Sequence, residues 1–235
     1  MSRVIVTSKK LPLLKEFLEE TIKDESDAGI GIFYFRDSIP VLEKIIPPFT
    51  VDDILNLMPA SGYCLMFARS TRATDICLQN CQPILIPSMG TAFVHDGTWS
   101  KSDALKFQFL LNNKISYDDY KIISESVVLG HLLDITGPDF LNDLSDGVVV
   151  IARKDGYYDC FVHKGFLYAI KIDSFWYYAT KFPDNILDLA TEAYSLKDGS
   201  IVRLYPHKHT YYKGGSFSVH ISNKDISAKE TPQTL

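Results

Sequence analysis

Short runs of consecutive apolar residues, separated by amphipathic segments, follow one another along the first hundred residues. Runs that are apolar at successive positions are typical of strands buried on both faces. We therefore predict strands at 4–7, 29–35, 63–68, 83–86 and 91–95. An amphipathic helix is predicted over residues 10–22, because apolar side chains recur there at steps of three and four. These side chains are Leu11, Leu14, Phe17, Leu18 and Ile22.

Further helices are predicted between and after these strands. The stretch 40–59 contains Pro47-Pro48 and predicts a loop and then a short helix that begins near Thr50. A helix is expected over 102–112, and another begins near Ser124 with apolar residues on one face. A third, short helical segment covers 140–144.

Beyond Gly147 the chain becomes rich in β-branched and aromatic residues, and turn dipeptides separate the runs. This texture predicts an antiparallel meander, and the last strand pair surrounds Asp198-Gly199. The sequence Phe-Trp-Tyr-Tyr at 175–178 could form a stacking platform for a ligand. We favour a strand with packed aromatic side chains.

The predicted elements and the composition indicate one layered domain. Helices grouped between two runs of strands are typical of stacked layers. A chain of 235 residues that is 46% hydrophobic can bury one sizeable core. We expect a single domain over 1–222 and a polar, disordered tail over 223–235.

Charge and hydropathy exclude several classes of partner. The formal net charge is -5 and the basic residues are scattered, so we expect no nucleic-acid partner. No apolar stretch is long enough to span a membrane, and the first residues lack the apolar core of a signal peptide. We expect a soluble, cytoplasmic protein.

Four cysteines are too few for a disulfide framework in a chain of this length. Cys77 and Cys81, together with His95, could begin a zinc site, but no fourth ligand follows at a suitable spacing. His207 and His209 alternate on an extended segment and do not make a site alone. We therefore predict reduced thiols, no metal and no cofactor.

Polar signatures at the ends of the predicted elements form an ordered series. They are Ser2, Ser-Asp-Ala-Gly-Ile-Gly at 26–31, Ser-Thr-Arg at 70–72, Asn-Cys-Gln-Pro at 80–83, Phe-Val-His-Asp-Gly at 93–97, Ser-Glu-Ser at 124–126 and Asp-Gly-Ser-Ile-Val at 198–202. In this order they resemble the glutaminase domain of class II glutamine amidotransferases, which belong to the N-terminal nucleophile hydrolase superfamily. The resemblance covers residues 1–205.

The resemblance implies an α+β fold, a four-layer αββα sandwich of two mainly antiparallel sheets. It also implies a mechanism in which the first residue of the mature chain attacks the amide carbon of glutamine, and its own α-amine transfers the proton. An Asn side chain and a Gly backbone N–H hold the oxyanion. An Arg binds the substrate carboxylate, and an acidic residue at a helix start binds the ammonium group.

Residue by residue, the implied substrate contacts are better preserved than the implied catalytic groups. Arg72 matches the carboxylate-binding Arg, Gly97 matches the backbone donor, and Glu125 falls at the position of the acidic ligand. Ser2 stands where the family has its catalytic cysteine, and Asp96 stands where it has the oxyanion Asn. An ionised Asp has no proton to donate and repels a developing oxyanion.

Each of these residues also has a purely structural interpretation. Ser2 could be an ordinary residue of the first strand, and Arg72 could form an ion pair with Glu125 or Asp75. Glu125 suits a helix N-terminus whatever its function, because the helix dipole favours an acidic side chain there. We expect His95 to be a packed, hydrogen-bonded histidine and not a general base.

Three functional hypotheses follow. The first is a stand-alone glutaminase-like domain, degenerate in chemistry, that serves as a binding or structural subunit with an amino-acid ligand (glutamine or glutamate) or a protein partner. The chain ends soon after the last signature, so we expect no attached acceptor domain. The second is an active amidohydrolase that uses Ser2 as an N-terminal nucleophile on glutamine or another amide. The third is a self-compartmentalising protease of the proteasome type, which the signatures support least.

Overall fold

The computed structural model describes most of the chain, and the fold is reported for these residues alone. They are 2–25, 28–69, 77–78, 80–98, 124–136, 141, 146–196, 199, 201–206, 211–212 and 217–218. The predicted helix over 102–112, the tail over 223–235 and the histidines at 207 and 209 lie outside them. The predicted segment 140–144 also lies outside, apart from Leu141.

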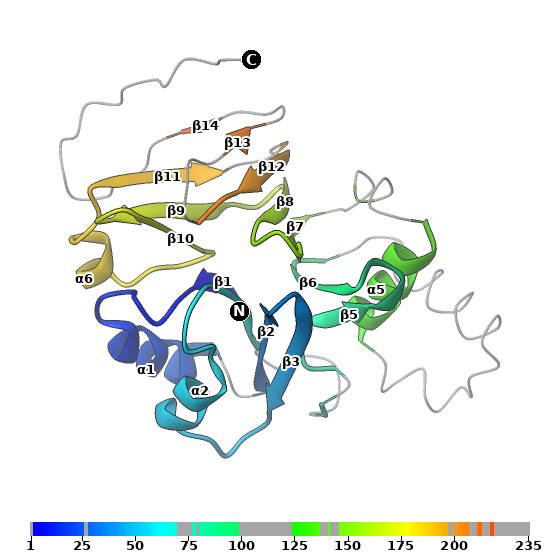
Figure 1. Cartoon of the computed structure of the whole chain (residues 1–235). Coiled ribbons are helices and arrows are strands. Elements are labelled where there is room, and N and C mark those ends of the chain that lie inside the picture. Colours follow the sequence, from blue (N-terminus) through cyan, green and yellow to red (C-terminus); the bar gives the residue numbers. More distant parts are fainter. Residues whose placement is uncertain are drawn as a thin grey trace.

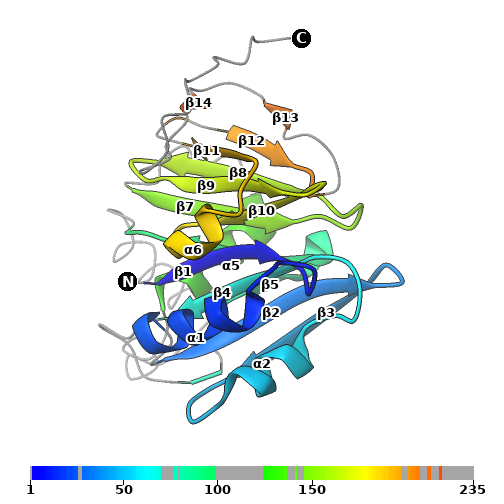
Figure 2. The same cartoon turned by 90° about the vertical axis from the view of Figure 1, so that its left-hand side faces the viewer.

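The described strands form two sheets in which every pairing is antiparallel, as Figures 1 and 2 show. Sheet A has the order β14-β11-β9-β10-β1-β4-β2-β3, and sheet B has the order β13-β12-β8-β7-β6-β5. The strands of sheet A are β1 (Arg3–Thr7), β2 (Gly29–Arg36), β3 (Ile39–Ile45), β4 (Cys64–Arg69), β9 (Leu167–Ile172), β10 (Phe175–Ala179), β11 (Glu192–Leu196) and β14 (Phe217–Ser218). Those of sheet B are β5 (Ile84–Ile86), β6 (Thr91–Asp96), β7 (Gly147–Ala152), β8 (Tyr158–His163), β12 (Ile201–Leu204) and β13 (Tyr211–Tyr212).

Helices cover the outer face of each sheet, so the layers run helix, sheet, sheet, helix (Figure 1). The helices α1 (Leu14–Glu25) and α2 (Val51–Leu57) pack on sheet A, and Ile186 of α6 (Asp184–Leu187) joins the same core. The helix α5 (Glu125–Thr136) packs on β5 and β6, next to the 3-10 turn η1 (Pro87–Met89). The predicted α+β, four-layer αββα sandwich is confirmed. None of the helices in the described ranges is long and apolar enough to cross a membrane.

The local predictions for the first hundred residues hold with one exception. The strands and the amphipathic helix are present, and Thr50 caps α2 by accepting a hydrogen bond from the Asp53 N–H at 3.3 Å. The loop predicted after residue 40 is wrong, because Ile39–Ile45 forms β3. This strand pairs only with β2 and is half-exposed, so it lacks a buried apolar run and tolerates Pro40 at the edge.

The predicted meander is also wrong in its connections, although its strands exist. β7 pairs with β8 in sheet B, whereas β9 pairs with β10 in sheet A, so the chain changes sheets after β8. The pair expected around residue 199 divides in the same way, since β11 joins sheet A and β12 joins sheet B. Trp176, Tyr177 and Tyr178 of β10 are buried, which confirms packed aromatic side chains there.

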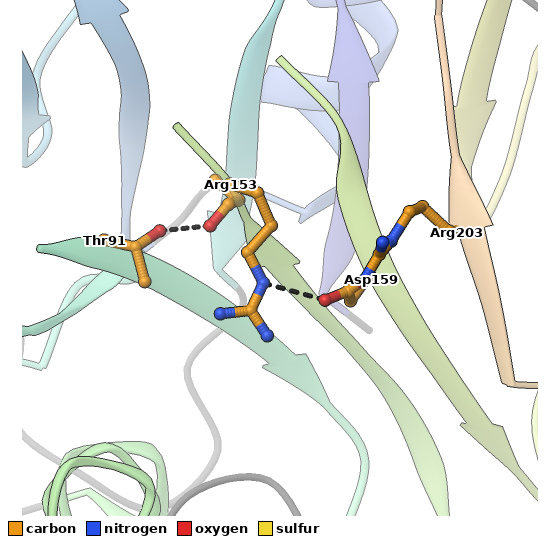
Figure 3. A network of polar contacts seen from close by, with 5 residues as sticks. Thr91, Arg153, Asp159 and Arg203 are labelled. Carbon is orange, nitrogen blue, oxygen red and sulfur yellow. Dashed lines mark hydrogen bonds and ion pairs between the residues drawn. The ribbon is translucent and has the colours of Figure 1, made fainter. Parts of the chain in front are cut away.

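A polar network fastens three strands of sheet B (Figure 3). The Asp159 carboxylate on β8 accepts a hydrogen bond from Arg153 Nε at 2.7 Å and from Arg203 Nε of β12 at 2.8 Å. The Arg203 guanidinium also lies over the Tyr157 ring, 4.2 Å from its centroid. On the other side of β7, the Thr91 hydroxyl donates to the Ala152 carbonyl. One carboxylate between two guanidinium groups therefore joins β8 to β12 and to Arg153, the residue that follows β7.

Candidate functional site

Ser2 directly precedes β1, which lies in the interior of sheet A between β10 and β4. The next residue, Arg3, is fully buried and points to the helix layer, since its Nη1 donates to Thr21 Oγ1 at 2.8 Å. Its Nη2 lies 3.7 Å from Glu20 Oε1. Successive side chains of a strand point to opposite faces, so we expect Ser2, the residue before β1, to face sheet B.

Asp96 and His95 are neighbours at the end of β6 but face opposite layers. Asp96 pairs with Val148, which belongs to the core between the sheets, and His95 pairs with Val149, which packs in the core beneath α5. The side chain of Asp96 therefore points to the space between the sheets, on the side of Ser2. β1 and β6 pack on each other across this space.

His95 is a packed residue, as expected, but the hydrogen bonding that we also expected of its side chain is missing at Nε2 among the described residues. Its side chain is buried. Burial lowers the pKa of His95 to about 4, although the charge of Asp146 partly opposes the shift. The imidazole is thus neutral and directed away from the space between the sheets, which argues against a general base.

Neutral His95 should make the free energy of unfolding depend on pH. The ordinary value is 6.5, so the unfolded chain binds more protons than the native chain between pH 6.5 and about 4. The stability that depends on neutral His95 is complete above pH 6.5 and falls by about 3 kcal/mol as the pH approaches 4. Urea unfolding across this range should show a flatter profile for His95→Gln than for the wild type. An unchanged slope in His95→Gln would contradict this role.

Gly97 follows Asp96 at a point where two backbones touch. A Cβ on Gly97 would lie 2.2 Å from the Asp146 carbonyl oxygen and 2.5 Å from Gly147 Cα. The Asp146 carboxylate accepts hydrogen bonds from the Thr98 hydroxyl at 2.5 Å and the Thr98 N–H at 2.6 Å, and these bonds lower the pKa of Asp146. The backbone around Gly97 is therefore held in place on both sides, which suits a fixed N–H donor.

The Asn-Cys-Gln-Pro turn connects this strand to sheet A and to α5. The Gln82 side chain accepts from the His95 N–H at 2.5 Å and donates to the His95 carbonyl at 2.8 Å and to Ser126 Oγ at 2.9 Å. Its backbone lies against Gly31 of β2, where a Cβ would meet the Gln82 carbonyl oxygen at 2.0 Å. The Asn80 side chain accepts from the Ser124 N–H at 2.9 Å, at the start of α5.

Replacing Gln82 should therefore destabilise the fold and detach β6 from α5. Gln82→Leu keeps most of the volume but removes three hydrogen bonds, and it leaves the His95 N–H and carbonyl buried without this partner. We expect a loss of about 2–4 kcal/mol in the free energy of unfolding, measured with urea. Ser126→Ala, which leaves Gln82 both of its hydrogen bonds to the His95 backbone, should lose less. Equal stability of Gln82→Leu and the wild type would contradict this role.

These contacts bring four of the five predicted site residues to one end of the sandwich. The registers Arg3↔Ala68 and Gly29↔Arg69 place Ser2 beside the end of β4 and the start of β2. Gln82 contacts Gly31 of β2 and is hydrogen-bonded to His95, near the end of β6, where Asp96 and Gly97 follow. It also bonds to Ser126 in the first turn of α5. Glu125 is the first residue of α5, half-buried and next to Ser126. Arg72 lies outside the described residues, three positions after the end of β4.

Sequence reasoning missed the residues that make these connections. The signature at 80–83 was identified, but the roles of Asn80 and Gln82 were not, because they depend on contacts with residues far along the chain. Gly147 lies against Gly97, but in the sequence it marks only the point where the region rich in β-branched and aromatic residues begins. Among the described residues, no group of three His, Cys, Asp or Glu side chains could hold a metal ion.

Solved structures of glutamine amidotransferases share this four-layer architecture. The glutamine phosphoribosylpyrophosphate amidotransferase of B. subtilis superposes with a TM-score of 0.67 at 14% identity, over 93% of this chain and 50% of that chain. The allosteric regulatory enzyme of purine biosynthesis gives 0.64 at 16% identity, over 91% and 49%. This chain thus spans about half the length of both.

A smaller protein has nearly the same extent as this chain. A glutamine aminotransferase class-II domain protein from Silicibacter pomeroyi superposes with a TM-score of 0.51 at 12% identity, over 91% of this chain and 99% of that chain. No protein-family model and no curated protein matches the sequence. At these identities the likeness establishes the glutamine amidotransferase-like fold.

Proposed function

We propose that this chain is a class II glutamine amidotransferase-like domain that binds an amino acid, glutamine or glutamate, and has lost glutaminase chemistry. In this role it is a binding or structural subunit in the cytoplasm, with a protein partner. The observation that carries the proposal is the orientation of Asp96, whose pairing with Val148 directs its carboxylate into the space between the sheets.

Asp96 is poorly suited to stabilise an oxyanion. Glutaminase chemistry develops a negative oxygen that the Gly97 N–H and the side chain at position 96 would hold. A neutral amide at position 96 would donate a hydrogen bond to this oxygen. A carboxylate has none to donate and repels the oxygen. Loss of a single oxyanion donor already lowers turnover by about 10²- to 10³-fold.

Ser2 weakens the chemistry further without removing its geometry. A hydroxyl is a poorer nucleophile near neutral pH than the cysteine thiol of the glutaminase family that this sequence resembles. The binding groups are the better preserved part of the proposed site. They are Arg72, for the carboxylate of the ligand, and Glu125, for its ammonium group. A scaffold with binding groups and a poor nucleophile fits a ligand-binding role.

Binding is tested by thermal unfolding with glutamine, glutamate and, as a mismatched ligand, succinate. A ligand present at about 100 times its Kd stabilises the native state by about 2.7 kcal/mol, so the melting temperature should rise with glutamine or glutamate. Arg72→Met should abolish this shift, whereas Arg36→Met, at the end of β2, should not. No shift with either amino acid at millimolar concentration would overturn the proposed binding role.

The alternative is an active amidohydrolase with Ser2 as N-terminal nucleophile, and the anchoring of Arg3 favours it because Ser2 is turned toward the space between the sheets. Intact-mass spectrometry separates the two functions, since Met1 retained on every molecule denies Ser2 its own α-amine. Where Met1 is removed, Ser2→Ala must abolish amide hydrolysis. Hydrolysis that persists in Ser2→Ala rejects Ser2 as the nucleophile.

A further inference from the structure

Cys77 and Cys81 lie on one turn beside the candidate site, and neither has a role in the proposed function. The N–H groups of Asn80 and Cys81 both donate to the Cys77 carbonyl at 3.2 Å, and these are the hydrogen bonds of a helical turn. One such turn separates Cα atoms by about 6 Å. Disulfides span Cα distances of roughly 4.4–6.8 Å, which includes this spacing. They also need Cβ atoms roughly 3.5–4.5 Å apart, whereas residues one helical turn apart have Cβ atoms about 5–6 Å apart, so a disulfide can close only if the turn opens slightly.

The two thiols differ in access to solvent. Cys77 is half-buried, whereas Cys81 is buried and burial raises its pKa to about 11. Cys64 and Cys160 are buried in the core, and burial raises the pKa of Cys64 to about 12. Within the part of the chain that the structure describes, Cys77 is thus the thiol open to a small oxidant.

Lys44 supplies a positive charge to this pair. Its ammonium group, on the edge strand β3, donates to the Leu78 carbonyl of the same turn at 3.1 Å. Its charge interacts with both thiols. Lys44 and, to a smaller extent, Arg69 favour the ionised form of Cys81 and so oppose the effect of burial on the Cys81 pKa. Burial lowers the pKa of Lys44, because a charged ammonium group is less stable away from water.

We propose that Cys77 and Cys81 are a redox-active thiol pair, oxidised by hydrogen peroxide to an intra-turn disulfide that Lys44 promotes. In the first step the Cys77 sulfur attacks one peroxide oxygen, and the O–O bond breaks to give a sulfenic acid and water. In the second step the Cys81 sulfur attacks the Cys77 sulfur, the S–O bond breaks and a second water leaves. Two thiols are oxidised and one peroxide is reduced to two waters.

The disulfide would form next to the residues that hold the candidate site together. Cys81 Sγ lies 3.3 Å from the position of a Cβ on Gly29, and Gln82 is the next residue. Closing the turn would therefore strain the segment that fastens β6 to α5. This consequence for ligand binding rests on the proposed function, but the thiol chemistry does not.

Peptide mass mapping tests the chemistry directly on the full chain. Trypsin releases residues 73–101 as one peptide, because the first Lys or Arg after Arg72 is Lys101. After peroxide treatment, quenching and alkylation under denaturing conditions, this peptide should carry no alkyl group and should lack two hydrogens. Peptides with Cys64 and Cys160 should be alkylated in full. Cys81→Ser should instead accumulate a sulfenic acid on Cys77, trapped by a 1,3-dione probe.

Lys44→Met tests the promoting charge and keeps the apolar stem of the side chain. Disulfide closure should slow several-fold in Lys44→Met, while Lys10→Met, whose ammonium group lies over Phe175, should close at the wild-type rate. The proposal is overturned if wild-type Cys77 passes to sulfinic acid while Cys81 remains alkylatable, or if oxidation yields only intermolecular Cys77 dimers. A glutamine-induced thermal shift in the reduced protein that is absent from the oxidised protein would show the further coupling to the site.

Discussion

Glutamine hydrolysis by a Ser2→Cys, Asp96→Asn double variant should exceed that of the wild type by at least about 100-fold. The first change restores a thiol at the residue before β1, and the second replaces a carboxylate by an amide that can donate a hydrogen bond to the oxyanion. A single oxyanion donor is worth about 10²- to 10³-fold in turnover, and the better nucleophile adds to it. Glutamate release measures the rate, after intact mass has shown that Met1 is removed.

Single variants and a remote substitution serve as controls for this gain. Ser2→Cys alone should gain little, because the Asp96 carboxylate still repels the oxyanion, and Asp155→Asn in an exposed turn should change nothing. If the double variant stays at the wild-type rate although it folds and binds glutamine, then Ser2 and Asp96 do not occupy the catalytic positions. The assignment of both residues would then be wrong.

Gly31→Ala should be among the most destabilising single substitutions in this chain. A Cβ at this position would lie 2.0 Å from the Gln82 carbonyl oxygen, 2.7 Å from the Gln82 carbonyl carbon and 2.8 Å from Pro83 Cδ. Backbone and proline atoms cannot rotate away as a flexible side chain can, so β2 and the turn must separate. We expect a loss of about 3 kcal/mol in the free energy of unfolding, measured with urea.

Gly62→Ala is the matched control for this substitution. Its Cβ would meet no atom within 4 Å, so its cost is limited to backbone strain at a φ of 83°, about 1–2 kcal/mol. Gly31→Ala should also weaken any glutamine-induced thermal shift, because Gln82 fastens β6 and α5. Equal losses in the two variants would show that Gly31 does not lie against the turn.

Local patterns predicted the elements well but not the sheet that each strand joins. Apolar runs identified β1, β2, β4 and β6, because a strand buried on both faces shows this pattern wherever it pairs. The same signal identified β5, although Leu85 of this edge strand is exposed. Turn residues mark where the chain reverses, but they do not show whether the next strand pairs with the last one or crosses to the other sheet. β9 and β12 were misplaced for this reason.

The order of the short signatures predicted the candidate site. No local sequence pattern predicted the contacts that link these signatures. Four signatures meet in the structure through Gly31, Gln82, His95 and Ser126. A glutamine side chain that pairs with the backbone of a strand 13 residues away leaves no periodic mark in the sequence. The inward orientation of Ser2 and Asp96 could be derived only once Arg3 and Val148 had been assigned to their layers.

Glutamate release from glutamine by the purified wild-type protein, freed of Met1, tests the loss of glutaminase chemistry most directly. With glutamine at a concentration that raises the melting temperature, we expect no release above that of the Ser2→Ala variant. Turnover within about tenfold of a typical enzymatic value near 10 s⁻¹ would contradict a degenerate glutaminase.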